Sequence, residues 1–237
     1  MSNLSFQKMK KCYFLKSKSF VLFSLIFSIF FIGSGFSLLE NKSKKPLFVV
    51  VIDAGHGGYD VGNECSDLKK FKQEKDVVLP VALQLGEYLE NLLENVKVVY
   101  TRKNDTFVSL EKRTEIANEA SADLFISIHA NHNPIKNIHG CQVHIHNGNI
   151  KFSKIFAQKL MKQLSERAKR KVLKIQTANS RGHNLFVLQN TKMPAVLLEL
   201  GFMSNPNEEV YLNSEYGQTI LASAIFRAVR EYREVAQ

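Results

Sequence analysis

The chain has 237 residues, of which 45% are hydrophobic and 23% charged, and a formal net charge of +10. That length is enough for one domain with a substantial hydrophobic core. Five of the 32 basic residues precede residue 40 without any acid, which leaves 27 basic against 22 acidic residues and a net charge of +5. So mild a positive charge excludes a strongly basic nucleic-acid-binding domain. It is compatible with binding to an anionic polymer outside the cytoplasm, and equally with no role beyond keeping the domain soluble.

The first segment in chain order has the layout of an export signal. Residues 1–18 contain five lysines and no acid, and residues 19–39 are uncharged and mostly apolar. This layout is typical of a secretory signal peptide, although about 20 apolar residues also suffice to cross a bilayer as a helix. We therefore predict a signal peptide or membrane anchor over 1–39, a linker over 40–46 and one domain over 47–237. The domain is expected in the periplasm or cell envelope, held at the inner membrane if the segment is retained, with membrane contact only through that segment.

The rest of the chain alternates between strand and helix patterns. Strands are predicted at 47–52, 97–101, 124–130, 140–146, 184–189 and 195–200. Helices are predicted at 77–96, 109–120, 151–169 and about 214–233. The first helix should begin near 74–77, because Pro80 fits only near its first turn, and Ser109 is the expected N-cap of the second. This alternation predicts an α/β fold: a single layered domain with a mostly parallel, twisted sheet and helices on both faces.

Three cysteines are present, and Cys12 falls in the leader. Cys65 and Cys141 are therefore the one exported pair that could form a disulfide. They have no CxxC metal spacing, and two cysteines do not make a disulfide framework, so their redox state stays open.

Polar side chains end several of the predicted buried strands. His56 follows the first strand in the stretch VVVIDAGHGG, His129 ends LFISIHA, and Glu199 ends AVLLEL. The carboxyl ends of parallel strands meet at one edge of a sheet, so these side chains are expected to converge. A buried carboxylate such as Glu199 needs a partner charge, a metal ion or a proton. A metal ion at this edge would satisfy all three residues.

Glu74, at the start of the long helix, is a fourth candidate. Zinc hydrolases commonly use three protein ligands, with two histidines and one glutamate as a known set, and keep the fourth position for water. His56, Glu74 and His129 would form that set around one zinc ion. Glu199 would then serve as the general base that passes a proton to a leaving nitrogen.

At this point the sequence resembles the zinc-dependent N-acetylmuramoyl-L-alanine amidases of the third amidase type, which trim bacterial peptidoglycan. The resemblance covers residues 48–232 and rests on five segments in this order: VIDAGHGG, EKDVVL, TRKNDTFVSLEKRTEIAN, ADLFISIHAN and MPAVLLELGFMSNP. In this family the histidines of the first and fourth segments and the glutamate of the second bind zinc. The resemblance therefore implies His56, Glu74 and His129 as ligands and Glu199 as the catalytic glutamate.

The implied reaction is hydrolysis of the amide between the lactyl group of N-acetylmuramic acid and L-alanine of the stem peptide. One departure is Gln142, within GCQVHIH, where many relatives have a glutamate. Relatives that are held inactive by an occluding helix carry it between the second zinc histidine and the catalytic glutamate. Only 70 positions separate His129 from Glu199, which predicts an open site.

Several other polar residues have two readings. Asp53 is expected to orient His56 or its turn, since carboxylates often fix a ligand imidazole. Asn131 and Asn205 either bind the muropeptide or cap turns, and Asn131 is the candidate substrate-binding residue of the two. A structural ion network is favoured over substrate contact for Arg102, Asp105 and Arg113.

The remaining histidines are given lesser roles. His144 and His146 are a rival metal pair, because a His-x-His pair on a strand points to one face, but no third ligand accompanies them, which favours a surface or groove role. We expect His132, His139 and His183 in loops.

Two further functions stay open beside the amidase. One is a zinc D,D-carboxypeptidase or endopeptidase acting on the stem peptide, because one scaffold can host several amide hydrolyses. The other is a peptidoglycan-binding protein that keeps the metal but catalyses little, against which the presence of Glu199 argues. The substrate preference, the oligomeric state and any activator or cell-division partner are not indicated by the sequence.

Overall fold

The computed structural model describes residues 46–147 and 150–236. The predicted signal or anchor over 1–39 lies outside these residues, as does the predicted linker apart from Pro46. Within the described part of the chain, no helix is both long enough and apolar enough to span a membrane.

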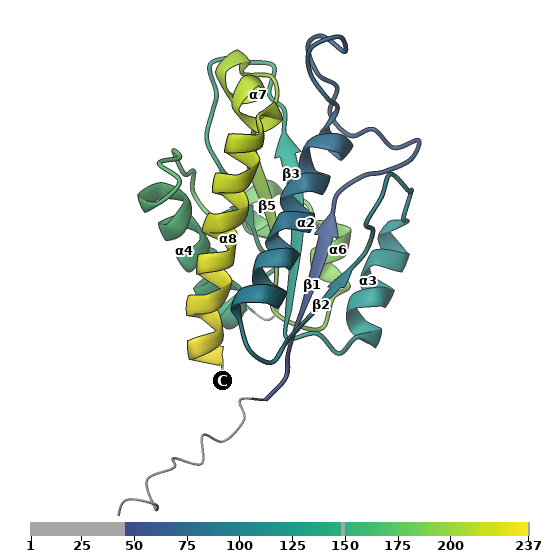
Figure 1. Ribbon diagram of the computed structural model, residues 1–237, viewed down its shortest axis with the longest axis vertical. Helices are drawn as coiled ribbons and strands as arrows, with labels where there is room; N and C mark the ends of the chain where they lie inside the picture. Colours follow the sequence, from purple (N-terminus) through teal and green to yellow (C-terminus); the bar gives the residue numbers. More distant parts are fainter. Residues whose placement is uncertain (1–45, 148–149, 237) are drawn as a thin grey trace, which may run out of the picture. The chain divides into compact units, whose positions relative to one another are not determined.

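A five-stranded sheet forms the centre of the domain (Figure 1). Its strands are β1 (Phe48–Ala54), β2 (Val96–Tyr100), β3 (Leu124–Asn131), β4 (Gln142–His144) and β5 (Ala195–Phe202). They lie in the order β2-β1-β3-β5-β4, and all neighbours are parallel except β4, which runs antiparallel to β5. The chain thus leaves β1 for one side of the sheet and later returns to its other side with β3.

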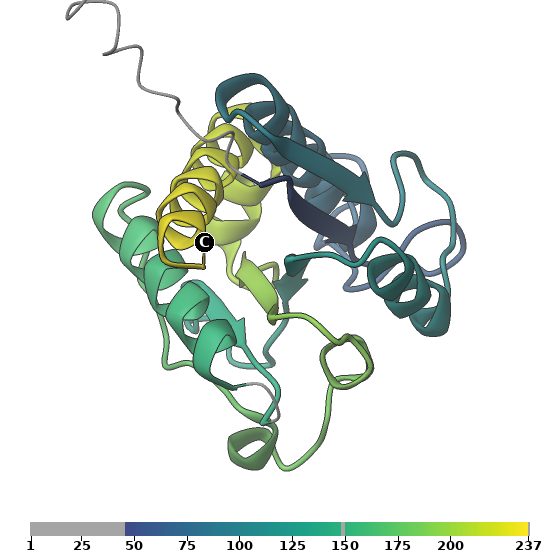
Figure 2. The same ribbon diagram turned by 90° about the horizontal axis from the view of Figure 1, so that it is seen from below.

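Helices cover both faces of this sheet (Figures 1 and 2). One face carries α2 (Glu74–Leu92), α4 (Ile150–Glu166) and α8 (Glu215–Ala236), and the other carries α3 (Leu110–Glu119) and α6 (Phe186–Gln189). Each face of the sheet has its own hydrophobic core, and alternate residues of β1 pack into one or the other. Val50 and Ile52 face α2 and α8, and Val51 faces α3 and α6. Two-sided burial explains why the strands are almost continuously apolar. The predicted fold class is confirmed.

Most predicted elements are present, but two predicted strands need correction and two helices were not predicted. The stretch predicted as a strand at 184–189 contains the one-turn helix α6, and the strand predicted at 140–146 shortens to the three residues of β4. The helix α7 (Pro206–Asn213) was missed, and the short α5 (Ala178–Arg181) with it. The start of α2 at Glu74 is as predicted, although Pro80 lies in its second turn and not its first. Ser109 caps α3 as predicted, by accepting a hydrogen bond from Lys112 N.

Neither Cys65 nor Cys141 forms a disulfide in this structure. The buried Cys141 thiol donates to the carbonyl of Leu200 over 3.1 Å, and the Cys65 thiol donates to the carbonyl of Phe71 over 3.3 Å. Burial raises the pKa of Cys141 to about 12, although the Arg170 guanidinium beside it opposes this shift. Both thiols therefore donate weak hydrogen bonds to backbone carbonyls within the domain.

Candidate functional site

Three side chains converge at the carboxyl edge of the sheet, in the crevice between β1 and β3. His56 follows β1, His129 lies near the end of β3, and Glu74 is the first residue of α2. Glu74 Oε1 is 3.1 Å from His56 Nε2 and 2.9 Å from His129 Nδ1. One ligand atom of each residue lies within 4.8 Å of the others, and no second group of this kind occurs among the described residues. Crevices where neighbouring connections leave in opposite directions are the usual binding sites of parallel sheets.

The turn after β1 brings these side chains together through close backbone contacts. A Cβ atom on Gly55 would lie 2.3 Å from Cε1 of His129, and one on Gly62 would lie 2.6 Å from Cδ2 of His56. Only glycine permits the backbone to come this close to the two rings. His56 itself has a φ of 58°, a left-handed conformation that costs a non-glycine residue about 1–3 kcal/mol. The surrounding structure must therefore hold this turn in place.

Two buried arginines hold the turn. Arg102 donates to the carbonyls of Ala54 (3.0 Å) and Gly55 (2.7 Å), and Arg113 donates to those of Ala54 (2.7 Å) and His56 (2.8 Å). Arg113 also pairs with Asp53 over 2.6 Å, and both side chains are almost fully buried. These contacts give Arg102 and Arg113 the structural role favoured from the sequence, while Asp105 pairs with Lys75 over 2.6 Å at the surface.

Asp53 acts on the turn through Arg113, and no described hydrogen bond joins it to His56. Its carboxylate accepts hydrogen bonds from Thr101 (2.7 Å), Ser127 (2.6 Å) and Arg113. Burial alone would raise the pKa of Asp53, but the Arg113 charge and these hydrogen bonds outweigh burial and lower it. Asp53 is therefore an ionised anchor beneath the site.

Two residues that the sequence analysis missed orient the candidate ligands. Asp60 Oδ1 bonds His56 Nδ1 over 2.8 Å, which leaves Nε2 facing Glu74. Asn63 donates to Glu74 Oε2 from its backbone (2.8 Å) and from its side chain (2.9 Å), which leaves Oε1 for the two imidazoles. Such outer partners commonly fix ligand orientation at metal sites. The presence of a carboxylate four residues after His56, in the same glycine turn, was the available signal for Asp60.

The charges at the site fit a bound cation. Burial would raise the pKa of Glu74, but hydrogen bonds and charges from His129 and His56 lower it well below its usual range. Burial would lower the pKa of His129, but the hydrogen bond and charge of Glu74, followed by the charges of Glu199 and Asp53, raise it to about 9. The site thus favours positive charge next to a buried carboxylate. Two imidazoles and one carboxylate are also a donor set that suits a divalent metal ion, whose binding displaces protons from the ligands.

Glu199 lies directly beside this group. It pairs in register with His129 on the neighbouring strand, and its Oε2 is buried without a hydrogen-bond partner among the described residues. Burial, aided by the Glu74 charge and opposed by the two histidines, raises the pKa of Glu199 to about 7. A buried carboxylate that is poised near neutral pH can both accept and donate a proton.

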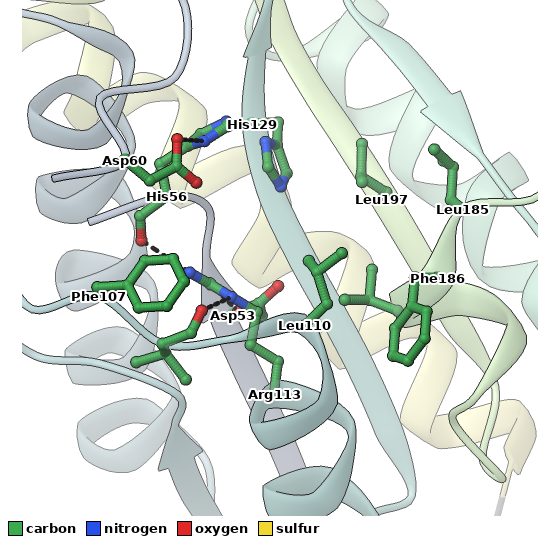
Figure 3. Close-up of a pocket in the computed structure, with 12 residues that line it drawn as sticks. Asp53, His56, Asp60, Phe107, Leu110, Arg113, His129, Leu185, Phe186 and Leu197 are labelled. Atoms are coloured by element: carbon green, nitrogen blue, oxygen red, sulfur yellow. Dashed lines mark hydrogen bonds and ion pairs between the residues drawn. The ribbon is translucent and has the colours of Figure 1, made fainter. Parts of the chain in front are cut away.

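A pocket of about 220 Å³ opens next to these residues, on the face of the sheet that carries α3 and α6 (Figure 3). His56, His129 and Asp60 lie at one side of it, and an apolar wall from α3, α6 and β5 includes Leu110, Phe186 and Leu197. The long helix α4 packs with α8 on the opposite face, and none of its residues lines the pocket.

The other candidates take different positions. The side chain of Asn131 accepts a hydrogen bond from His132 N over 2.8 Å, and Asn205 caps α7 by accepting from Asn207 N and Glu208 N. Gln142 pairs in register with Glu199. His144 is buried on β4 and belongs to no group of three metal-ligating residues in the described part of the chain, and neither does His146.

Comparison with known proteins decides the family. The family model of N-acetylmuramoyl-L-alanine amidases matches residues 50–231, which include His56, Glu74, His129 and Glu199. The chain belongs to this family. This finding confirms the resemblance seen in the sequence. The amidase family accounts for the five segments, of which four supply the residues that converge at the crevice.

Individual relatives of the amidase family agree with this assignment. The chain is 36% identical over 196 residues to a probable cell wall amidase, LytH, of Staphylococcus aureus, which covers 81% of this chain and 62% of LytH. The chain thus spans less than two thirds of that relative. An N-acetylmuramoyl-L-alanine amidase from Clostridium difficile 630 is 33% identical, with a TM-score of 0.73 over 80% of this chain and 98% of that one. CwlD amidase from Clostridioides difficile, solved in complex with the GerS lipoprotein, is 27% identical, with a TM-score of 0.72 over 79% and 99%.

Proposed function

We propose that the protein is a peptidoglycan amidase that cleaves the amide between the lactyl group of N-acetylmuramic acid and L-alanine of the stem peptide. The observation that carries this proposal is the buried, unpartnered Oε2 atom of Glu199 beside the His56, Glu74 and His129 group, in a chain of this family. His56, Glu74 and His129 would hold one zinc ion, which supplies a Lewis acid for the amide carbonyl and lowers the pKa of water.

The residues of the chain itself have distinct tasks in this reaction. Glu199 accepts the proton of the attacking water and gives it to the nitrogen of L-alanine, which leaves as an amine. No covalent bond to the protein is needed, because water is the nucleophile. Asp60 and Asn63 keep His56 and Glu74 in position throughout. The pocket beside His129 supplies an apolar wall for the parts of the muramoyl group next to the reacting amide.

The setting of the reaction follows from the same proposal. Peptidoglycan lies outside the cytoplasm, so the basic and apolar segment over 1–39 would direct the domain over 47–237 to the cell envelope. Whether that segment is removed or kept as an anchor decides if the enzyme is free or membrane-bound. Asn131, at the end of β3 and partly exposed, is our candidate for a direct substrate contact.

Mass analysis of a purified muropeptide digested by the full-length protein tests the proposal. The wild type should release an intact glycan and a free stem peptide, and chelation should abolish the release until zinc is restored. Glu199→Gln should lower kcat by about 10²–10⁴-fold, the usual contribution of a general acid and base, with bound zinc unchanged. Glu166→Gln, at the exposed end of α4, is the matched control and should retain full activity.

Two other outcomes would overturn the proposal. Loss of only a terminal D-alanine would assign a carboxypeptidase to the site. Intact muropeptide after incubation with the zinc-loaded protein would favour a binding protein.

A further inference from the structure

A second group of polar atoms without partners lies beyond the crevice, at the end of β4. Arg181, the last residue of α5, makes hydrogen bonds to the described residues only through Nη1. Nη1 donates to the carbonyls of Gln176 (3.1 Å) and Ile145 (3.5 Å) and lies 3.3 Å from Nδ1 of His144. Nε and Nη2 are buried and have no hydrogen-bond partner in the described structure.

The unpartnered edge of Arg181 has a specific shape. Nε–H and one N–H of Nη2 point the same way and are spaced to bind both oxygens of a carboxylate. Native proteins rarely leave such buried donors unpaired, because each costs roughly 1–3 kcal/mol. Among the described residues no acidic side chain pairs with this charge, and burial lowers the pKa of Arg181. The anchored Nη1 and the free edge together form a preorganised receptor for an anion.

An open pocket of about 590 Å³ lies beside α5, the short helix that ends at Arg181. Ala178, which lies in α5 with Arg181, and Gly182, which follows Arg181, line it together with His146 and His183. The Nδ1 atom of His146 is likewise buried and without a partner. His146 therefore contributes an unpartnered nitrogen to the lining of this pocket, and the unpartnered nitrogens of Arg181 belong to the helix whose Ala178 and Asn179 form part of the same lining.

This pocket is within reach of a ligand that extends from the crevice. His144, which touches Arg181, pairs in register with Leu197, and Leu197 lines the pocket beside His129. Only β5 separates β4 from β3, which places the two strands about 10 Å apart. An extended peptide spans about 3.5 Å per residue, so a carboxylate two to four residues from the reacting amide lies about 7–14 Å away from it.

We propose that the pocket beside Arg181 binds a carboxylate of the stem peptide, and that Arg181 holds it through Nε and Nη2. This subsite rests on the proposed amidase function and orients the substrate, with the peptide running across β5 toward α5 and the sugar on the side of α3. A carboxylate is favoured over the phosphates of an anionic wall polymer, because the stem peptide is joined to the reacting amide and brings its carboxylate to this distance.

The test uses two muropeptides that differ only in their stem-peptide carboxylates, which are free in one and amidated in the other. The wild type should prefer the free acid by about 10- to 100-fold in kcat/KM, the value of a hydrogen-bonded charge pair. In Arg181→Gln this preference should fall to nearly 1, while the amidated substrate is cleaved within about threefold of the wild-type rate. Arg181→Lys keeps the positive charge but lacks the paired N–H donors of the guanidinium group, so it should retain part of the preference for the free acid.

Arg167→Gln, at an exposed position after α4, is the matched control and should leave the preference unchanged. A wild type that cleaves both substrates equally would refute the subsite, as would Arg181→Gln with an unchanged preference. If Arg181→Gln and Arg181→Lys both lower kcat/KM equally on the two substrates, Arg181 has a structural role. Inhibition of the wild type by a phosphate polymer, without any carboxylate preference, would assign the pocket to that polymer. A wild type that cleaves neither muropeptide contradicts the amidase function itself, so the two failures are distinguishable.

Discussion

Replacing Asp53 with asparagine tests how the turn that carries His56 is held. Asp53 and Arg113 form an ion pair in which the two side chains are 0% and 3% exposed. The amide of asparagine has nearly the same shape but removes the negative charge, so Arg113 is left buried without its counter-ion. Because Arg113 also donates to the carbonyl of His56, the change should reach the turn as well as the core.

The expected loss of stability follows from this burial. Removing one partner of a buried ion pair typically costs about 3–5 kcal/mol. A domain of this size loses about 2–4 °C in Tm for each kcal/mol, so Asp53→Asn should unfold about 6–20 °C below the wild type. Ser109→Ala, which removes only the exposed N-cap of α3, should cost about 1 kcal/mol and serves as the control.

The sign of the pH dependence provides a second check. Because the folded protein lowers the pKa of Asp53 below its usual value of 3.8, the ion pair stabilises the fold at all pH values above that range. Its contribution should be lost as the pH falls through the lowered pKa. Chemical denaturation at pH 7 and pH 3 should therefore show a smaller difference between wild type and Asp53→Asn at the lower pH.

One result would refute the reasoning about Asp53. If Asp53→Asn unfolds at the wild-type temperature but binds zinc more weakly, Asp53 acts on the imidazole directly and not through Arg113. Calorimetric melting without zinc, combined with a zinc titration, separates the two effects.

Three further predictions concern the candidate metal centre. Gly55→Ala should displace the His129 ring, because the new Cβ would lie 2.3 Å from it. Zinc titration should then show an affinity at least 100-fold lower, which is about the largest loss seen when residues that hydrogen-bond to metal ligands are replaced. Asp60→Ala should weaken zinc binding by about 10–100-fold by freeing the His56 ring, and Asp67→Ala, in an exposed turn, should not. Activity should fall as the pH drops through the pKa of Glu199, because a base must be deprotonated. Burial raises that pKa to about 7 and bound zinc lowers it again, so the pH profile of kcat/KM should have its acidic midpoint at or below pH 7, and a midpoint above pH 8 would contradict the assignment.

Most of the sheet and the long helices that cover it were predictable from hydrophobic periodicity alone. Strands buried on both faces read as apolar runs, and α2, α4 and α8 each present one apolar stripe. The stretch at 184–189 was wrongly predicted as a strand, because a run of about six residues with apolar side chains fits a strand and a helical turn equally well. Here Val187 and Leu188 are buried against the sheet in a single turn. The helix α7 did carry a signal, since Asn205 and Pro206 are a typical N-cap followed by a first-turn proline.

The candidate site was predictable to the extent that it lies at strand ends. The polar residues after β1, in β3 and in β5 converge because parallel strands end at one edge, and that required no knowledge of loops. The roles of Asn63 and Arg181 depend on the paths of irregular segments that fold back on Glu74 and His144. No local pattern encodes such a contact between residues that lie far apart in the sequence.

The left-handed backbone at His56 gives the fold and the site opposite preferences at this position. Backbone strain favours glycine, whereas metal binding requires histidine. A glycine at this position would relieve the backbone and leave the carbonyl contacts of Arg102 and Arg113 intact. Drift toward glycine would therefore yield a chain that folds at least as well but has lost a ligand. Only selection for chemistry retains a histidine here, so a descendant freed from that selection should lose His56 before it loses Asp53 or Arg113.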